Sequence, residues 1–343
     1  MNQNHQSNGL SVALLILIIL AGANQIEQDR RPLVKGGIDV NIPTVTKKST
    51  SKPYNNNNSS SNINNNNQNQ NSSIKREEYL AAAEVLGNGG LGSAYKVTLG
   101  SGVSVVVKRV REMNQMTKEV FDTEMKKLAK LKHQNILTPL AYHFRKEEKL
   151  LVSEYVSKGS LLYVLHGEHG ISHAELNWDE RLKIVKGEFT SYPLPHGDLK
   201  SSNVLIGSDY EPLLSDYAFY PLLNNTPTLQ SMFAFKSPEA TLNQNISQKS
   251  DVYCMGIIIL EIITGKYPSQ YCNNQKSGTD VVQWVKSALA ENRGKELIDP
   301  EIVPSSVLEM EKILHIGAAC TESVPDERID LTEAIRRIEE VSV

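Results

Sequence analysis

The sequence predicts an α+β fold with two lobes, and two segments of opposite character indicate it. Residues 94–98 and 103–107 have strand character and flank a Gly-Ser-Gly turn, so we expect them to form a β-hairpin. Residues 256–265 form an apolar run that ends at a glycine, as expected of a buried helix. From Lys75 onward about 265 residues remain, enough for a two-lobed domain with its own core.

The N-terminal part of the chain predicts a flexible tether. Residues 55–71 are almost all Asn, Gln and Ser, with Ile63 as the one sizeable apolar side chain. Such a stretch buries too little apolar surface to offset the entropy that ordering would cost. We therefore expect a short tail over residues 1–9, a disordered Asn-rich linker over residues 27–75, and folded chain over residues 79–343.

A candidate membrane anchor over residues 10–26 lies between the tail and the linker, and its residues 10–23 are almost wholly apolar. Residues 10–23 would rise only about 21 Å as a helix, short of the ~30 Å hydrocarbon layer of a bilayer. We expect a single membrane anchor that thins the bilayer locally. The rest of the chain would be cytoplasmic, because basic residues first occur after the run, at Arg30. A cleaved signal peptide, indicated by the small residues 21–23, and a misassigned N-terminus are the alternatives.

Composition argues against two other classes of protein. The formal net charge of −3 leaves no basic excess, so we expect no nucleic-acid partner. The three cysteines, Cys254, Cys272 and Cys320, are odd in number and lack metal-ligand spacing. They favour free thiols in a reducing compartment over a disulfide framework.

A glycine-rich segment over residues 86–92 predicts a nucleotide-binding flap. Its glycines let backbone amides approach phosphate oxygens without interference from a Cβ atom. In a dinucleotide-binding fold such a segment leads from a strand into a helix, whereas here a β-hairpin follows. The expected nucleotide contacts are Leu86, Gly87, Asn88, Gly89, Gly90, Leu91 and Gly92.

Lys108 and Glu124 predict an ion pair beside this flap. Lys108 ends a run of valines that we expect to be buried, where an unpaired ammonium group would be costly. Apolar residues from Phe121 to Leu131 recur at helical spacing, and Glu124 lies on the same face. We expect Glu124 to be the partner of Lys108. The alternative is a lysine whose stem packs at the strand end while its ammonium group reaches water.

Three polar motifs follow these elements in a fixed order. They are His196-Gly197-Asp198-Leu199-Lys200-Ser201-Ser202-Asn203, Asp216-Tyr217-Ala218 and Ser237-Pro238-Glu239. Taken singly, Asp198 and Asp216 would be ordinary turn residues. Together with the glycine-rich segment, Lys108 and Glu124, the ordered set resembles a protein kinase, and closely a plant pollen receptor-like kinase of the leucine-rich-repeat receptor family.

The resemblance extends over residues 79–343 and includes motifs at residues 83–89 and 336–341. It implies a single-pass protein of the plasma membrane, anchored through residues 10–26, with a protein substrate or a co-receptor as partner. The implied lobes are a small β-rich N-lobe over residues 79–153, a hinge over residues 154–157 and a large helical C-lobe over residues 158–343.

The resemblance also implies that the protein binds ATP with Mg²⁺ as cofactor. Lys108, held by Glu124, would position the α- and β-phosphates. Backbone groups near Glu154 and Val156 in the hinge would bind adenine.

Phosphoryl transfer is the reaction that the resemblance implies, with four residues in named roles. Asp198 would orient the hydroxyl group of a Ser or Thr in a protein substrate and accept its proton. Lys200 would neutralise the γ-phosphate. Asn203 and Asp216 would ligate magnesium through oxygen atoms.

Two supporting contacts are implied in the helical lobe. Asp251 would accept hydrogen bonds from backbone N–H groups of the segment that begins at His196. Glu239 and Arg328 would form the ion pair that holds the activation segment to the far helices. If that pair is buried, removal of one partner would cost several kcal/mol. A surface ion pair is the alternative.

The chain also departs from the family pattern. Gly197 replaces an arginine that would contact a phosphate on the activation segment, and Ala218 replaces a flexible glycine. The helix that starts at residues 181–187 lacks about ten residues, or ~15 Å of helix, before the motif that begins at His196. In addition, no leucine-rich repeat precedes residue 75. These departures leave two alternatives to an active kinase: a pseudokinase scaffold that acts through protein contacts, and a product that does not fold.

Overall fold

The computed structural model describes the chain from residue 82 onward, with gaps. The described residues are 82–89, 91–98, 102–110, 116–146, 149–167, 176–188, 195–220, 237–243, 246–268, 281–302 and 306–342. The expected tail, membrane anchor and linker, over residues 1–75, lie outside them. Within the described part, no helix is both long enough and apolar enough to cross a bilayer.

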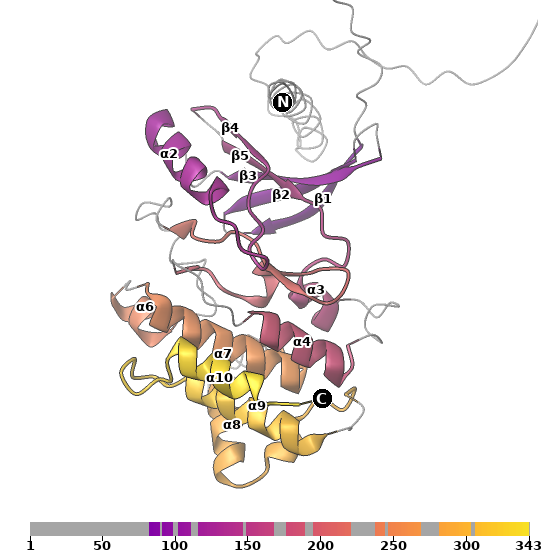
Figure 1. The fold of residues 1–343 in the computed structure, drawn as a ribbon, viewed down its shortest axis with the longest axis vertical. Helices are drawn as coiled ribbons and strands as arrows, with labels where there is room; N and C mark the ends of the chain where they lie inside the picture. Colours follow the sequence, from indigo (N-terminus) through magenta and orange to yellow (C-terminus); the bar gives the residue numbers. More distant parts are fainter. Residues whose placement is uncertain are drawn as a thin grey trace, which may run out of the picture.

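A five-stranded antiparallel sheet forms the first lobe, in the order β1-β2-β3-β5-β4 (Figure 1). The expected hairpin is confirmed, because β2 pairs with β3 and Ala94 lies opposite Lys108. The strands are β1 (Ala82–Gly89), β2 (Gly92–Thr98), β3 (Ser104–Val110), β4 (Ala141–Phe144) and β5 (Lys149–Glu154).

Alternation along β3 places Lys108 on the sheet face that α2 (Lys118–Ala129) covers. Lys108 pairs with Leu151, and Leu151 pairs with Tyr142, so the three side chains share one face. The ring of Tyr142 meets the ring of Phe121 on α2 edge-on, with 5.6 Å between centroids. A second cluster of buried aliphatic residues consists of Val97, Val105, Val107, Leu150 and Val152.

Helix α2 confirms the helical spacing read from the sequence. The Thr117 hydroxyl caps its first turn, and Phe121, Met125 and Leu128 are buried against the sheet lobe. Glu124 lies at the edge of this buried stripe, because its side chain keeps 31% of its surface exposed. An acidic side chain in that position is not forced to find a buried cation.

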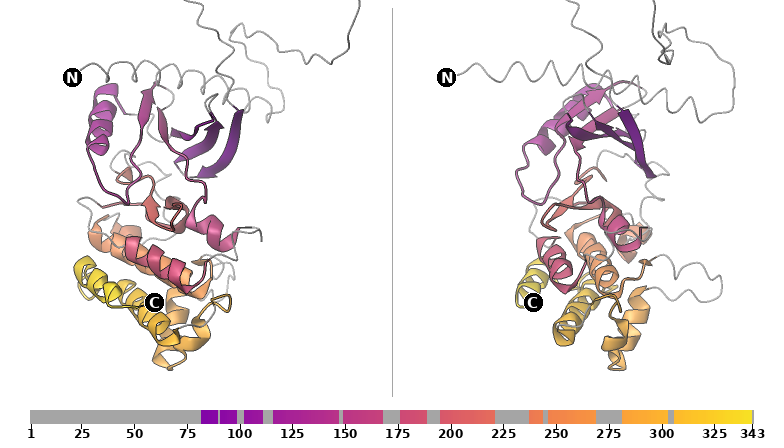
Figure 2. Two further views of the ribbon diagram at one scale, coloured as in Figure 1. Left: turned by 45° about the vertical axis from the view of Figure 1, so that its right-hand side comes forward. Right: turned by 90° about the vertical axis from the view of Figure 1, so that its right-hand side faces the viewer.

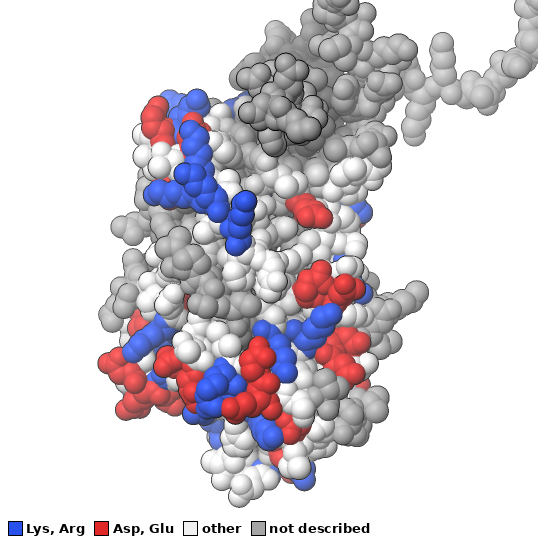
Figure 3. Space-filling view, viewed as in Figure 1, with Lys and Arg blue, Asp and Glu red and all other residues white. Residues whose placement is uncertain are grey.

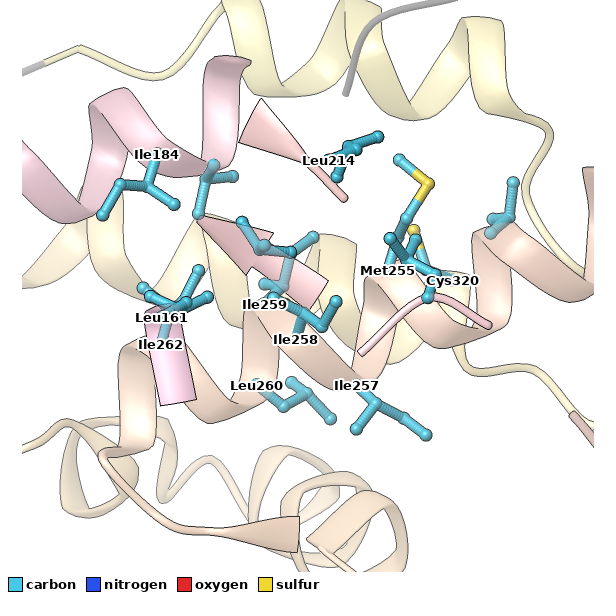
Figure 4. Packing of buried hydrophobic residues seen from close by; sticks show 14 of the residues in the cluster. Leu161, Ile184, Leu214, Met255, Ile257, Ile258, Ile259, Leu260, Ile262 and Cys320 are labelled. Carbon is cyan, nitrogen blue, oxygen red and sulfur yellow. The ribbon is translucent and has the colours of Figure 1, made fainter. Parts of the chain in front are cut away.

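Helix α7 (Gln248–Thr264) forms the centre of the helical lobe (Figures 1 and 2). Ser247 and Ser250 cap its start reciprocally, and Gly265 ends it in the left-handed conformation, with φ of 63°. Residues 255–264 are all buried, which confirms the expected buried helix. Figure 4 shows its isoleucine and leucine side chains spreading among the surrounding elements.

Helices α7 and α9 (Val307–Cys320) approach each other at two glycines. A Cβ atom added to Gly256 would lie 2.7 Å from the Cβ of Cys320, and one added to Gly317 would lie 2.8 Å from Leu260. Both glycines therefore set the separation of the helices. The other elements of this lobe are α3 (Leu161–His166), η3 (Ser201–Asn203), β6 (Val204–Ile206), β7 (Pro212–Leu214), α6 (Pro238–Asn243), α8 (Val281–Ala290), η6 (Gly294–Leu297) and α10 (Leu331–Glu339).

Helix α4 (Trp178–Glu188) is the helix that we expect to be short. Trp178, Leu182 and Ile184 are buried in the main core. Arg181 is also buried and forms an ion pair with Asp299 at 2.8 Å, and burial lowers the pKa of its guanidinium group despite that partner. Residues 189–194, which lead toward the catalytic motif, lie outside the described residues, so the shortened connection stays a prediction.

Candidate active site

A short β-hairpin brings two of the polar motifs together. β6 and β7 pair in antiparallel register, with Val204 opposite Leu214. Beyond that pair, the backbone N–H and the hydroxyl group of Ser215 both donate to the carbonyl oxygen of Asn203, at 2.8 and 3.1 Å. Asn203 and Asp216 therefore emerge from the same end of the hairpin.

Asp251 on α7 holds the start of the candidate catalytic motif, residues 196–203. Its Oδ2 accepts a hydrogen bond from the backbone N–H of His196 at 2.6 Å, and its Oδ1 accepts one from Gly197 at 3.0 Å. These bonds confirm the expectation from the resemblance. Burial raises the pKa of Asp251 to about 7, although both N–H donors favour its charged form.

His196 is a buried, neutral ring that connects the two motifs. Its Nε2 lies 3.0 Å from the carbonyl oxygen of Ser215, and its Nδ1 lies 3.3 Å from the backbone nitrogen of Asp198. A carbonyl oxygen only accepts, so Nε2 carries the proton and Nδ1 accepts. Burial lowers the pKa of His196 to about 4. The ring also meets Tyr217 edge-on, with 5.8 Å between centroids.

Asp198, the candidate catalytic base, is surrounded by donors. The Lys200 ammonium group lies 3.0 and 2.9 Å from its two carboxylate oxygens. The side-chain amide of Asn203 donates to its backbone oxygen at 2.8 Å and to its Oδ2 at 3.1 Å. Burial raises the pKa of Asp198 to about 6, against the effect of Lys200, and the nearby charge of Asp216 raises it further. The structure thus brings these four predicted residues together.

The oxygen atoms of this site fit magnesium. Asn203 directs its amide nitrogen to Asp198, which leaves its side-chain oxygen to ligate a metal beside the Asp216 carboxylate. Among the described residues, no three His, Cys, Asp or Glu side chains cluster as a metal site. Mg²⁺ needs no such cluster, because phosphate oxygens and waters complete its coordination.

Lys108 and Glu124 do not pair with each other in this conformation. The Lys108 ammonium group instead donates to Oδ2 of Asp216, whose side chain is 7% exposed. Glu124 accepts a hydrogen bond from Lys127 of its own helix at 2.6 Å. The predicted ion pair between Lys108 and Glu124 is therefore absent from this structure. Lys108 has the carboxylate of Asp216 as its partner, and Glu124 has the ammonium group of Lys127. The roles of Lys108 and Glu124 toward nucleotide phosphates stay predictions.

The glycine-rich segment connects β1 and β2, as a flap requires. Gly89 pairs with Gly92, and a Cβ atom on Gly92, where φ is 140°, would lie 1.8 Å from the carbonyl oxygen of Arg109. Only glycine fits there. The other predicted contacts differ in exposure: Leu86, Gly87 and Asn88 are exposed, Leu91 is buried, and Gly90 lies outside the described residues.

The predicted hinge follows β5. Glu154 ends that strand opposite Val105 and is exposed, and Val156 follows it in a half-buried position. The chain that follows β5 leads from the sheet into the helical lobe (Figure 1). Adenine binding at these groups stays a prediction.

Glu261 on α7 is a supporting residue that the sequence analysis did not name. Its Oε1 accepts hydrogen bonds from the hydroxyl group of Ser201 at 2.9 Å and lies 2.9 Å from Nε2 of His166. Burial raises the pKa of Glu261. The signal was present in the sequence, because an acidic residue inside an apolar helix requires partners. Glu261 thus gives the catalytic motif a second attachment to α7.

The ion pair between Glu239 and Arg328 is confirmed. Two guanidinium nitrogens lie 2.7 and 3.0 Å from the two carboxylate oxygens, and the Arg328 side chain is fully buried. Arg328 also donates to the backbone oxygens of Glu322, at 2.8 Å, and Lys249, at 2.5 Å. The pair ties α6, which follows the activation segment, to the far side of the lobe.

Comparison with known proteins agrees with this geometry. A family model described as protein kinase domain matches residues 80–337. The chain belongs to the protein kinase family. In sequence, this kinase is 62% identical over 273 residues to pollen receptor-like kinase 6 of Arabidopsis thaliana and 58% identical over 275 residues to pollen receptor-like kinase 3 of the same plant. The predicted resemblance to pollen receptor-like kinases is confirmed.

The matches cover only part of these relatives. They include 76% and 77% of the kinase chain but 41% and 43% of the two relatives, so the chain spans about two fifths of their length. Among solved structures, the pseudokinase domain of BIR2, an immune regulator of the RLK/Pelle family, is 26% identical with a TM-score of 0.65, covering 78% of this chain and 82% of that one. The maize SIRK1 kinase domain bound to AMP-PNP is 28% identical with a TM-score of 0.66, covering 80% and 98%.

The two sequence departures at the kinase site both occupy left-handed backbone positions. Gly197 has φ of 80° and Ala218 has φ of 55°. The conformation is free of strain for glycine, whereas for alanine it costs on the order of 1 kcal/mol. Ala218 is buried, so the surrounding core holds it in this conformation.

Proposed function

We propose that this kinase domain binds Mg·ATP and transfers the γ-phosphate to Ser or Thr hydroxyl groups of proteins in plant signalling. The observation that carries the proposal is the group formed by Asp198, Lys200, Asn203 and Asp216, in which Asp198 is enclosed by an ammonium group and an amide. A group of turn residues without a common role would have no reason to share these hydrogen bonds in a largely enclosed site.

The residues of the site suggest how transfer would proceed. Asp198 is ionised at neutral pH, so it can orient the acceptor hydroxyl and take its proton as the oxygen attacks the γ-phosphorus. Lys200, already bonded to Asp198, would offer its remaining N–H groups to the γ-phosphate. Magnesium, held by Asn203 and Asp216, would neutralise phosphate charge when bound.

Lys108 must exchange partners during nucleotide binding. In the described conformation its ammonium group bonds Asp216. Its place on the sheet face covered by α2 puts it above the same motif, so a triphosphate can replace Asp216 as its anionic partner. Glu124 would then turn from Lys127 toward Lys108.

The names of the relatives support a proposal about localisation. The relatives are named receptor-like kinases. We propose that the apolar residues 10–26 anchor the chain in the plasma membrane once, with the kinase domain in the cytoplasm and with a protein substrate or a co-receptor as its partner.

Radiolabelled ATP with a generic basic protein tests the proposed transfer. The wild-type chain should incorporate label, and an Asp216→Ala variant should not. Asp209→Ala, at an exposed aspartate of the β6–β7 turn, is the matched control and should behave like the wild type. Equal labelling by the wild type and the Asp216→Ala variant would mean that phosphoryl transfer is not its function.

A pseudokinase scaffold is the second candidate function. The bond between Lys108 and Asp216, with Glu124 turned to Lys127, favours it, because both nucleotide-binding charges are already neutralised. A thermal shift with Mg·ATP separates the candidates. Stabilisation without labelling selects the scaffold, and absence of a cooperative melting transition selects the third alternative, a chain that does not fold.

A further inference from the structure

Tyr220 packs directly against Gly197 of the catalytic motif. A Cβ atom built on Gly197 would lie 2.5, 2.7 and 2.8 Å from Cδ1, Cγ and Cβ of Tyr220. These distances are far below van der Waals contact, so the tyrosine side chain occupies the space that any side chain at position 197 would need.

Gly197 is held by its other groups as well. Its N–H donates to Asp251 of α7 at 3.0 Å, and its φ of 80° is a conformation that glycine adopts without strain. Asp198 is the next residue. Whatever fixes Gly197 therefore fixes the direction in which the Asp198 carboxylate leaves the backbone.

Tyr220 is in turn attached to the metal-binding motif. It follows Asp216 by four residues, through the buried Ala218 and Phe219. The backbone N–H of Phe219 donates to the carbonyl oxygen of Asp216 at 3.4 Å, which closes a tight turn. The contact between Tyr220 and Gly197 thus joins the segment of Asp216 to the segment of Asp198, in addition to the β6–β7 hairpin.

We propose that Tyr220 is a positioning residue, which holds the catalytic loop by packing on Gly197 instead of through a charged side chain at that position. The expected kinetic effect of this role rests on the proposed function, whereas the packing contact between Tyr220 and Gly197 does not. It implies that the position of the Asp198 carboxylate depends on an aromatic ring and not on a phosphate group. It also implies that a side chain at position 197 is tolerated only when the ring of Tyr220 is removed as well.

A double-mutant cycle tests the contact without requiring activity. The proteins are the wild-type chain, Gly197→Ala, Tyr220→Ala and the double variant, with Tyr220→Phe as the control that keeps the ring. Gly197→Ala should lower the melting temperature by about 2–4 °C more in the presence of Tyr220 than in its absence, because removing the ring makes room for the methyl group. Additive melting shifts would overturn the contact.

Steady-state kinetics test the positioning role. Gly197→Ala and Tyr220→Ala should each lower kcat by about tenfold or more while KM for ATP stays within about twofold, because Asp198 is displaced and the nucleotide contacts are not. Tyr220→Phe, which keeps the ring, should retain the kcat of the wild type. A coupled melting cycle with unchanged kcat in Tyr220→Ala would overturn the role in positioning. An inactive wild-type protein would contradict the proposed function, and the melting cycle would still decide whether Tyr220 holds Gly197.

Discussion

The helical lobe and the β-rich lobe hold their polar groups in different ways. In the helical lobe, Asp251 and Glu261 bind the catalytic motif from a helix remote in sequence, and the bonded groups are buried. In the β-rich lobe, Glu124 bonds a lysine of its own helix near the surface. The segment of Asp198 is therefore fixed by buried hydrogen bonds to another helix, whereas Glu124 would have to leave Lys127 to take the role proposed for it.

Surface charge follows the same division. Figure 3 shows Lys and Arg side chains gathered over α2, whereas both signs are interspersed over the helical lobe. On α10, Arg336 and Arg337 both bond Glu333 at 2.7 Å. On α2, Lys127 pairs with Glu124, which is the residue that the proposed nucleotide site would need for Lys108. Competition for Glu124 is thus local and weak.

The largest effect should come from the buried pair that supports the helical lobe. Arg328→Ala removes a fully buried guanidinium group, leaves the half-buried carboxylate of Glu239 without its cation, and should lower the free energy of unfolding by about 3–5 kcal/mol. Arg336→Ala on the exposed face of α10 is the matched control and should change the free energy of unfolding far less. Urea denaturation measures both. Similar losses for the two variants would remove the distinction between buried and surface pairs.

The close approach of α7 and α9 should be the next most sensitive feature. Gly256→Val forces side-chain atoms into Cys320 and Thr321 and should destabilise the domain by about 1–3 kcal/mol through overpacking. Gly87→Ala in the β-rich lobe adds a methyl group that meets nothing within 4 Å and serves as control. Thermal unfolding of both variants compares the lobes directly. A tolerated valine would show that the two helices can separate.

The pH profile should report the environment that the helical lobe gives Asp198. Burial raises its pKa to about 6, so the base is charged above that pH and becomes protonated as the pH falls through it. We expect kcat/KM to fall about tenfold per pH unit below pH 6. Lys200→Gln removes the cation that opposes this shift and should move the acid limb upward. A limb near pH 4 would mean that Asp198 is more solvated than described.

The smallest effect should come from the competition for Glu124. Lys127→Ala removes its local partner and should tighten Mg·ATP binding by about twofold, because an exposed pair of this kind is worth only ~0.2–1 kcal/mol. Lys126→Ala removes the same charge from a neighbouring exposed position and should leave the affinity unchanged. Calorimetric titration measures both affinities. Equal changes would indicate a general charge effect of α2 and not release of Glu124.

Much of the fold could be predicted because its signals are local. The run of valines before Lys108, the apolar spacing from Phe121 and the terminal glycine at Gly265 each indicate one element without knowledge of the others. The convergence of Asp198 and Asp216 was predictable only from the ordered motifs and the resemblance they carry, since nothing in either segment alone distinguishes a metal ligand from a turn residue.

The partners within the site were harder to predict, for physical reasons. Lys108 had two carboxylates available, and sequence spacing does not rank Asp216 against Glu124. The lysine three residues after Glu124 was a visible signal, because such pairs stabilise helix surfaces. The packing of Tyr220 on Gly197 had no signal beyond the missing side chain. Arg181 likewise reads as an ordinary helix residue, and only the folded core shows its burial against Asp299.

The two glycines between α7 and α9 connect distant positions to the reaction. The catalytic motif is attached to α7 at both Asp251 and Glu261, so a shift of this helix moves the base relative to the metal ligands. Substitutions at Gly317 and around Cys320 should therefore lower the proposed phosphoryl transfer, although these residues pack between two helices and not in the candidate site. Such variants would lose activity because α7 is displaced, and not because a residue of the site is missing.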